Sequence, residues 1–362
     1  MIVERLELRN FRNIAAATLE LSPHFNFLIG PNGAGKTVVL EALHLLLRGR
    51  SFRTHRVSLL IRHGERELAV QALCQHPLRG RERISLTKDR GNRTELRVNE
   101  EPIKQISAVA GLLPLQVLLP DLADLVFGAP QGRRQWLDWG AFHVKHDYID
   151  VLRRYMRVLR QRNALLRSRD ARTLDTWTDR MIEAGDLVIR ARTEYLETVR
   201  EALSSCIGAL APGLEVRARH YPGFEGDSLA EEVGARTPGD VKLGFTQVGP
   251  HRADVRLEAG DNAAAGVLSR GQGKLVASAM RIGQAGGLLT DQSRPSLFLI
   301  DDVWTELDDD HSARFMRLLD GMGCQILATS THEPVAARSV AADRVRVFHV
   351  KHGEITPARP AQ

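Results

Sequence analysis

The sequence predicts an α/β fold in which one sheet is assembled from both ends of the chain and a helical lobe is inserted between them. Three observations predict it. Residues 30–37 have the spacing of a phosphate-binding loop between an apolar run and a helix-like run. Residues 297–302 form a second apolar run that ends in two aspartates. Residues 131–211 lie between these segments, contain no proline and carry apolar side chains at helical spacing, with a heptad-like seam over 174–195. The glycines, prolines and aspartates at 212–240 predict a return to the sheet domain by loops.

The length and composition bound the organisation. The 362 residues exceed one ordinary domain, and a hydrophobic content of 43% with 26% charged residues predicts a sizeable packed core. We expect the N-terminal part of the sheet domain over 1–115, the helical lobe over 116–240, and the C-terminal part of the sheet domain over 241–362.

The cysteines and the N-terminus predict a cytoplasmic location. Cys74, Cys206 and Cys324 are far apart, odd in number and without metal-ligand spacing, so reduced thiols are the simplest account. The first eight residues include acidic side chains where a signal peptide needs an apolar run. No window approaches about 18 uncharged apolar residues, so we expect no membrane span.

The phosphate-binding loop predicts ATP as the ligand. Its glycines let backbone N–H groups turn toward an anion, and the N-terminus of the following helix adds partial positive charge. Lys36 is expected to reach the β- and γ-phosphates, and the Thr37 hydroxyl is expected to hold Mg²⁺. The nucleotide-binding residues of this loop are Gly30, Pro31, Asn32, Gly33, Ala34, Gly35, Lys36 and Thr37.

The aspartates that follow the apolar run at 297–300 supply the second half of such a site. A phosphate loop needs a further carboxylate near Mg²⁺, usually after a neighbouring strand. We expect Asp301 to help hold the metal and Asp302 to act as a general base or to position water. The alternative is a helix N-cap after a core strand. Gln116 is a candidate lining residue near the metal, and His332, which follows another expected strand, could sense the γ-phosphate or simply be exposed.

A second glycine-containing segment precedes the helix expected at 275–282. Ser269, Arg270, Gly271 and Gln272 would form another anion site at a helix N-terminus, or only a flexible loop. One triphosphate rarely needs two such sites in one chain. We therefore expect this segment to complete the ATP site of a second subunit in a homodimer. Asp308, which follows the two aspartates, is a further expected nucleotide-binding residue.

These elements, in this order, resemble the head of ABC-type ATPases and, within them, the RecF family of the SMC-like group. The likeness covers nearly the whole chain and is carried by residues 8–13, 30–37, 120–121, 132–139, 159–166, 249–254, 268–272, 299–302 and 306–308. Thr305, Gly273 and Ala253 depart from residues common in the family.

The resemblance implies an ATP-dependent DNA-binding protein of recombinational repair and replication restart. It implies an ATP-induced dimer that clamps DNA at single-strand gaps and junctions, helps load RecA together with RecO and RecR, and supports the SOS response. We expect ATP hydrolysis to be weak, to depend on DNA and to act as a switch.

Two basic clusters are candidate DNA contacts. Residues 145–172 contain nine Lys or Arg against three Asp, a surplus that equals the +6 of the whole chain. The second cluster follows the helix after the phosphate loop and consists of Arg48, Arg50, Arg53, Arg56 and Arg62. Concentrated positive charge attracts the DNA backbone without reading its sequence, although a solvated helix face is the alternative. The aromatic content of 5% favours duplex backbone over stacked single strands. The predicted DNA-binding residues are Arg53, Arg56, Arg153, Arg154, Arg157 and Arg160.

Other functions stay open at this point. A metabolic P-loop kinase would have a complete site in one chain, a lid with a catalytic arginine and no use for Ser269. An SMC- or Rad50-like structural ATPase head without a mediator role would carry long coiled coils, which the insertion is too short to form. A transporter ATPase shares the head motifs but lacks the inserted helical lobe.

Overall fold

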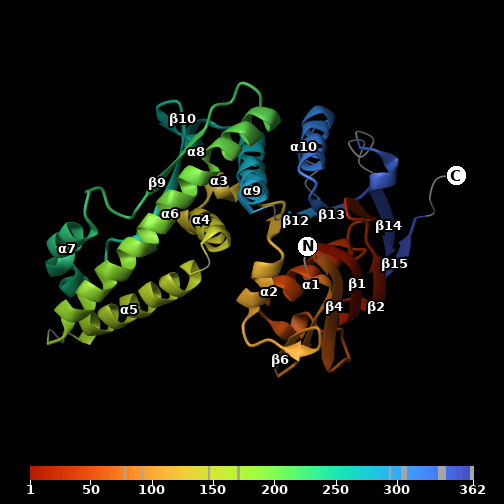
Figure 1. Ribbon diagram of the computed structural model, residues 1–362, viewed down its shortest axis with the longest axis horizontal. Helices are drawn as coiled ribbons and strands as arrows, with labels where there is room; N and C mark the ends of the chain where they lie inside the picture. Colours follow the sequence, from red (N-terminus) through yellow and green to blue (C-terminus); the bar gives the residue numbers. More distant parts are fainter. Residues whose placement is uncertain are drawn as a thin grey trace. The chain divides into compact units, whose positions relative to one another are not determined.

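The computed structural model describes residues 1–76, 79–91, 93–145, 147–168, 172–292, 295–302, 308–332 and 340–358. The chain packs into two compact units (Figure 1). Unit 1 comprises Met1–Leu122 and Ala285–Gln362, and unit 2 comprises Ala123–Gln284. The sequence-based division assigns residues 241–284 to the sheet domain, whereas they pack within unit 2.

Unit 1 contains a mostly parallel six-stranded sheet in the order β15-β14-β3-β13-β12-β8, in which only β15 runs antiparallel to its neighbour. The central strand β3 comes from the N-terminal part of the chain and pairs with two strands from the C-terminal part, as the sequence predicts. Its five residues are all buried, which is typical of a parallel strand covered on both faces. The strands are β3 (Phe25–Ile29), β8 (Leu115–Leu118), β12 (Leu297–Asp301), β13 (Gln325–Ser330), β14 (Val345–Lys351) and β15 (Glu354–Pro357).

The second sheet of unit 1 is antiparallel, in the order β2-β1-β4-β5-β6-β7. Buried and exposed side chains alternate along much of β4 and β5, because one face packs on the core and the other meets solvent. Its strands are β1 (Ile2–Phe11), β2 (Ile14–Glu20), β4 (Glu67–His76), β5 (Gly80–Asp89), β6 (Thr94–Val98) and β7 (Glu101–Pro102). The helices of unit 1 are α1 (Lys36–Arg48), η1 (Val57–Leu59), α2 (Ile106–Leu112), α10 (Asp309–Gly321) and η5 (Ala342–Arg344).

Helix α1 belongs to a core that includes side chains from both sheets. Nearly all of its residues are buried, as expected for a helix without a solvated face. It ends at Gly49, whose φ of 70° allows its N–H to bond the Leu45 carbonyl. The helix predicted over 36–47 is confirmed, and its burial fixes the position of the loop that precedes it.

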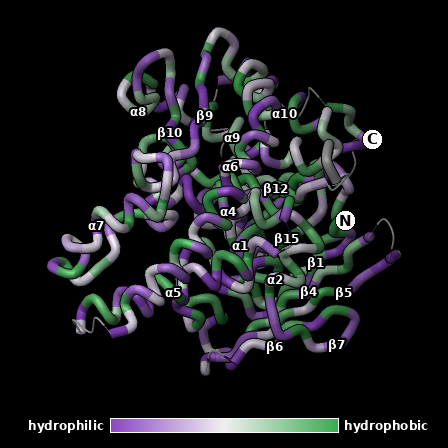
Figure 2. Tube along the Cα trace, turned by 60° about the vertical axis from the view of Figure 1, so that its left-hand side comes forward, coloured by the Kyte–Doolittle hydropathy of each residue, from purple (hydrophilic) through white to green (hydrophobic). Residues whose placement is uncertain are grey.

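Unit 2 contains a helical hairpin and a small sheet in the order β11-β10-β9. Helix α6 has 37 residues and is therefore about 55 Å long at 1.5 Å per residue. The seam predicted along it is confirmed at Met181, Ala184 and Val188, which are fully buried. Figure 2 shows hydrophilic and hydrophobic colours along α5, as expected for an amphipathic helix. The elements are α3 (Asp124–Phe127), α4 (Pro130–Val144), α5 (Tyr148–Ser168), α6 (Leu174–Leu210), β9 (Arg217–Tyr221), α7 (Leu229–Leu243), η2 (Pro250–Arg252), β10 (Asp254–Ala259), β11 (Asn262–Ala263), α8 (Ala264–Val267) and α9 (Arg270–Gln292). The last residues of α9, from Ala285 on, belong to unit 1.

Residues 212–240 differ from the sequence expectation. Their glycines, prolines and aspartates predict loops, but strand β9 and most of helix α7 lie there. The Ser228 side chain caps α7 by accepting the Glu231 N–H, and the helix continues through Pro238 to Gly244. Within the described residues, no helix is long and apolar enough to cross a membrane.

Candidate nucleotide-binding site

The phosphate loop lies between β3 and α1 in unit 1. Gly35 caps α1 with a φ of 110°, a left-handed conformation that side chains other than glycine rarely adopt. Gly30 meets a different constraint, because a Cβ there would lie 2.1 Å from the Val350 carbonyl oxygen. The loop therefore requires glycine at both ends, and its backbone can wrap an anion at the start of a buried helix.

Lys36 lies across this loop. Its ammonium donates hydrogen bonds to the carbonyl oxygens of Gly30 at 2.7 Å and Pro31 at 3.0 Å. Burial lowers the pKa of Lys36, while the negative charges of Asp302 and Asp301 oppose that shift. The Lys36 amino group therefore lies within the loop, where a phosphate group would contact it.

Asp301 connects the phosphate loop to the end of β12. Thr37 Oγ1 donates to Asp301 Oδ1 at 2.8 Å, and Thr329 Oγ1 donates to the same oxygen at 2.7 Å. A hydroxyl and a carboxylate are hard oxygen ligands that suit Mg²⁺, which takes few ligands from protein and others from phosphate and water. The described residues contain no group of three or more His, Cys, Asp or Glu placed to hold a metal by themselves. The Thr37 hydroxyl and the Asp301 carboxylate therefore fit Mg²⁺ that is bound together with a nucleotide.

Asp302 has left-handed backbone geometry, with φ 52°. Its N–H donates to Thr329 Oγ1 at 3.0 Å, so the same threonine positions both aspartates. Burial raises the pKa of Asp302; Lys36 lowers it, Asp301 raises it further and His332 lowers it. A carboxylate with a raised pKa at the end of a buried parallel strand is suited to accept a proton from water.

The other predicted catalytic residues lie at different levels of the sheet. His332 is exposed just beyond β13, and its Nδ1 lies 2.9 Å from Thr331 Oγ1. Gln116 is fully buried on β8 opposite Phe298, three residues before Asp301. At about 3.3 Å per residue, its backbone lies roughly 10 Å below the end of β12. The structure gathers His332, but not Gln116, near the strand ends.

The segment predicted to complete a partner's site belongs to unit 2. Ser269 N–H donates to Gln272 Oε1 at 3.0 Å, and Gln272 N–H donates to Ser269 Oγ at 3.2 Å. These reciprocal bonds form a capping box at the start of α9 and leave Arg270 and Gly271 exposed. Gly273 has a packing reason, since a Cβ there would lie 2.2 Å from the Phe127 ring. The segment is therefore an ordered helix N-terminus and not a flexible loop.

Asp308 lies at the N-terminus of α10 in unit 1. Its carboxylate accepts the His311 N–H at 2.8 Å, and this hydrogen bond lowers the pKa of Asp308. The side chain is exposed, so it is accessible to a second molecule. Thr305, Glu306 and Leu307, which carry part of the predicted motif, lie outside the described residues.

A cavity of about 730 Å³ adjoins the loop on the side of the β1–β2 turn. Asn13 lines this cavity, and its side chain also contacts the phosphate loop at the Ala34 carbonyl, 3.5 Å away. Arg12 lines it too and forms a two-bond ion pair with Glu41 of α1. The sequence draws attention to residues 10–13 but gives no sign of the Glu41 contact. The lining residues are Arg12, Asn13, Ser58, Leu59, Ile61, Arg62, His63 and Arg90.

The arginines predicted to contact DNA differ in whether they already form an ion pair with a carboxylate. Arg53 and Arg56 are exposed, and Arg157 and Arg160 are exposed on α5. Arg153 forms an ion pair with Asp150 at 3.2 Å. Arg154 forms one with Glu183 at 2.8 Å. Arg169, which the charge count includes, lies outside the described residues.

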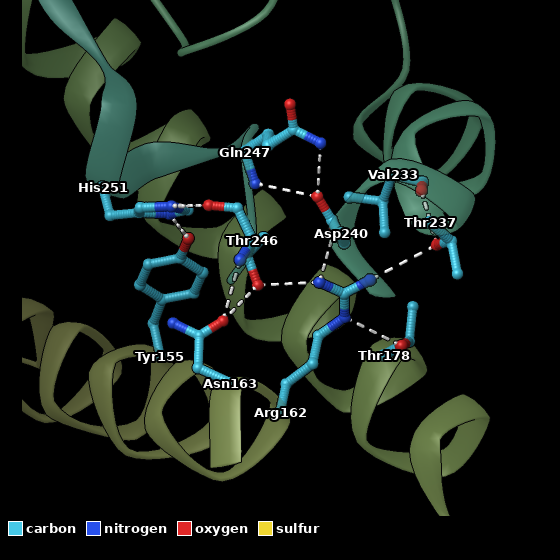
Figure 3. Close-up of polar contacts among 10 residues, drawn as sticks. All are labelled: Tyr155, Arg162, Asn163, Thr178, Val233, Thr237, Asp240, Thr246, Gln247 and His251. Carbon is cyan, nitrogen blue, oxygen red and sulfur yellow. Dashed lines mark hydrogen bonds and ion pairs between the residues drawn. The ribbon is translucent and has the colours of Figure 1, made fainter. Parts of the chain in front are cut away.

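Arg162 corrects the charge count of the helical lobe. Figure 3 shows it surrounded by polar partners from α6, α7 and the segment before η2. It is fully buried, and its guanidinium bonds Asp240 at 2.8 Å and Thr246 at 2.7 Å. Its charge is therefore neutralised inside unit 2, and the basic surface of α5 is smaller than the sequence predicts.

The comparisons with known proteins decide the family. The model described as RecF/RecN/SMC N terminal domain matches residues 2–356. The DNA replication and repair protein RecF of Shewanella baltica strain OS155 is 36% identical over 359 residues, covering 98% of this chain and 99% of that protein. The chain belongs to the RecF family.

A further relative agrees with RecF membership, and a solved structure shares the fold. The RecF protein of Marinomonas sp. strain MWYL1 is 36% identical over 362 residues, covering 98% of each chain. A solved structure titled as the recombination mediator protein RecF-ATP in the RecFOR pathway superimposes with a TM-score of 0.86 at 24% identity. That alignment covers 99% of this chain and 98% of the solved one, so the fold matches that of RecF throughout.

Proposed function

We propose that the chain binds ATP with Mg²⁺ at the phosphate loop. The observation that carries the proposal is the contact of Thr37 with Asp301 at 2.8 Å beside a buried Lys36, because residues from both ends of the chain meet there. Bound Mg²⁺ would neutralise phosphate charge between Thr37 and Asp301. Lys36 would exchange its two loop carbonyls for phosphate oxygens, which form stronger, charge-assisted hydrogen bonds.

The cavity beside Asn13 is our proposed compartment for the nucleoside. It adjoins the phosphate loop through Asn13, and its wall combines the apolar Leu59 and Ile61 with arginine side chains. Asp302 would then orient water toward the terminal phosphate, with His332 beside it. ATP hydrolysis would be slow. Its role would be to return the chain from the ATP-bound conformation, and not to drive a chemical reaction on a substrate.

We further propose that ATP joins two copies of the chain. Ser269, Arg270, Gly271 and Gln272 form an ordered helix N-terminus that has no triphosphate to bind within unit 2, and Asp308 is exposed. A partner chain would bring these residues to the open side of the bound nucleotide. The dimer would close its basic surfaces, including Arg53, Arg56, Arg157 and Arg160, around DNA.

The role in replication and repair follows by analogy with the RecF proteins. The chain would act at gapped duplex DNA with RecO and RecR, help place RecA, and so support the SOS response. The alternative is a structural SMC- or Rad50-like head without a mediator role. The hairpin favours the first, because an α6 of about 55 Å is far shorter than the long coiled coils of such heads.

Fluorescence anisotropy on gapped duplex DNA, with and without ATP, tests the proposal. We expect ATP to raise DNA affinity, added salt to lower it, and sedimentation to show an ATP-dependent dimer that Ser269→Arg weakens. If neither the sedimenting mass of the chain nor its DNA affinity changed on addition of ATP, the ATP-gated clamp would be ruled out. RecA loading on gapped DNA in the presence of RecO and RecR is then measured with and without this chain. Faster loading with the chain indicates a mediator, and an unchanged rate indicates a purely structural head.

A further inference from the structure

Glu41 is a carboxylate in α1 whose side chain is wholly buried, one helical turn after Thr37. Charged side chains are almost never fully buried unless they are paired. Glu41 accepts two hydrogen bonds from the Arg12 guanidinium, at 2.5 and 2.6 Å, and a third from the Ser51 hydroxyl. No role in binding phosphate or metal accounts for this carboxylate.

Ser51 connects Glu41 to a basic loop, defined here as residues 50–56. Its hydroxyl oxygen donates its hydrogen to Glu41 and accepts the N–H groups of Arg53 at 2.9 Å and Thr54 at 3.0 Å. One atom therefore connects the buried carboxylate to the turn that carries the exposed Arg53. Among the described residues, no carboxylate forms an ion pair with Arg50, Arg53 or Arg56, so their charges are available to an anion.

Arg12 connects Glu41 to the nucleotide side. It lines the cavity beside the phosphate loop, and it is 21% exposed, so it is the open member of the pair. Its backbone has a φ of 51°, and its N–H donates to the Leu60 carbonyl at 2.7 Å. Left-handed geometry in a residue other than glycine persists only where surrounding contacts enforce it. The backbone at Arg12 is therefore held by Leu60, which lies in the segment that follows the basic loop.

We propose that Glu41 is a positioning residue that couples occupancy of the nucleotide site to the conformation of the basic loop, through Arg12 on one side and Ser51 on the other. The inference rests on the proposed function, because it needs nucleotide beside Arg12 and DNA at the loop. A bound anion attracts the Nη2 group of Arg12 away from Glu41 Oε1, the oxygen that Ser51 also bonds, while Arg12 Nε still bonds Glu41 Oε2. The freed Glu41 oxygen then competes for other donors, which changes the hydrogen bond that fixes Ser51. Such a change couples two sites only if the ligands favour different arrangements.

The test measures coupling and not stability. The affinity of a non-hydrolysable ATP analogue with Mg²⁺ is measured with and without saturating duplex DNA, and the ratio of the two dissociation constants is the coupling. We expect a ratio of about five or more in the unaltered chain, within the usual range for coupled sites. We expect Glu41→Gln and Ser51→Ala to bring it within about twofold of one. Ser51→Ala leaves the Arg12–Glu41 pair intact, so it tests the relay even if Glu41→Gln folds poorly.

Ser22→Ala is the matched control. Ser22 is also a buried serine of unit 1 whose hydroxyl accepts a backbone N–H, from His24 at 3.2 Å, but it has no link to Glu41. We expect it to retain the coupling of the unaltered chain. Coupling that survives Ser51→Ala, or that Ser22→Ala lowers equally, overturns the inference and leaves the proposed function standing. A ratio of one in the unaltered chain overturns both.

Discussion

Arg12 in unit 1 and Arg162 in unit 2 each pair with a carboxylate whose side chain is wholly buried, but their surroundings differ. Arg162 is itself fully buried and donates to Asp240 and to the hydroxyls of Thr178, Thr237 and Thr246. Every one of these partners lies in unit 2 and is fixed by helix packing. Arg12 instead faces a cavity and shares Glu41 with Ser51.

The difference separates two uses of a buried ion pair. A buried polar network whose donors and acceptors are all satisfied fixes one conformation, because any rearrangement leaves a charge unpaired. A pair that borders a cavity can share one member with a ligand, because the five N–H donors of the Arg12 guanidinium allow it to bond an anion in the cavity while it still bonds Glu41. We therefore expect substitutions around Arg162 to change stability, and substitutions around the phosphate loop to change binding.

The largest effect is expected at Asp240. Asp240→Ala leaves Arg162 buried without its counter-ion, which typically costs about 3–5 kcal/mol in the free energy of unfolding. Urea denaturation measures it, with Asp240→Asn as a control that keeps a hydrogen-bond acceptor and should cost less. A loss below about 1 kcal/mol would show that the network can rearrange, and the contrast with Arg12 would fail.

The pH dependence of stability sharpens the same contrast at His251. Burial lowers the pKa of His251 to about 4, and its ring lies 2.7 Å from the Tyr155 hydroxyl and 3.0 Å from the Thr246 carbonyl oxygen. Between pH 6.5 and 4 the unfolded chain binds a proton that the native chain does not, so stability falls as the pH falls. The contribution of this residue is on the order of 3 kcal/mol.

His251→Gln should therefore flatten the fall in unfolding free energy between about pH 7 and 4. Thermal or urea unfolding at several pH values measures it. The exposed His349→Gln variant is the control and should follow the unaltered chain. If His251→Gln and the unaltered chain showed the same pH profile, the neutral His251 ring would not contribute to the stability of the hydrogen-bond network around Arg162.

Lys36 should show the opposite behaviour, with a large effect on binding. Lys36→Met removes the charge that lies across the phosphate loop but keeps most of the length of the side chain. Hydrogen bonds to charged groups contribute about 1.5–3 kcal/mol, so ATP affinity should fall roughly 10- to 100-fold. Titration calorimetry measures it, and Asp240→Asn serves as the control with unchanged affinity. Wild-type affinity in Lys36→Met would remove the phosphate loop from the proposed site.

The smallest effect is expected at the surface of α5. Arg157→Glu with Arg160→Glu should lower duplex affinity, and the slope of log affinity against log salt should fall by roughly one for each phosphate that the variant no longer neutralises. The already paired Arg153, changed to Glu, should have less effect. Fluorescence anisotropy with duplex DNA at several salt concentrations measures the affinity and the salt slope of the double variant and of the Arg153→Glu variant. Equal effects would mean that all the arginines of α5 act only through the general charge of the surface.

Local patterns predicted much of the fold and part of the site. The phosphate loop, α1, β12 and the α6 seam depend on residues that are neighbours in sequence, so spacing and burial are visible without coordinates. The loops expected over 212–240 were wrong because composition does not show that Ser228 caps a helix able to include Pro238. The role of Gly273 is likewise a packing fact, since it depends on the Phe127 ring.

The order of residues along the chain was enough to establish that a phosphate loop and a pair of aspartates exist, and that most of the chain separates them. Tertiary packing was needed to establish that Thr37 meets Asp301, that Thr329 positions both aspartates, and that Arg162 is buried while Arg157 is not. The cause is range. Turn geometry and apolar periodicity act between near neighbours along the chain, whereas hydrogen bonds and ion pairs depend on which distant segments pack together.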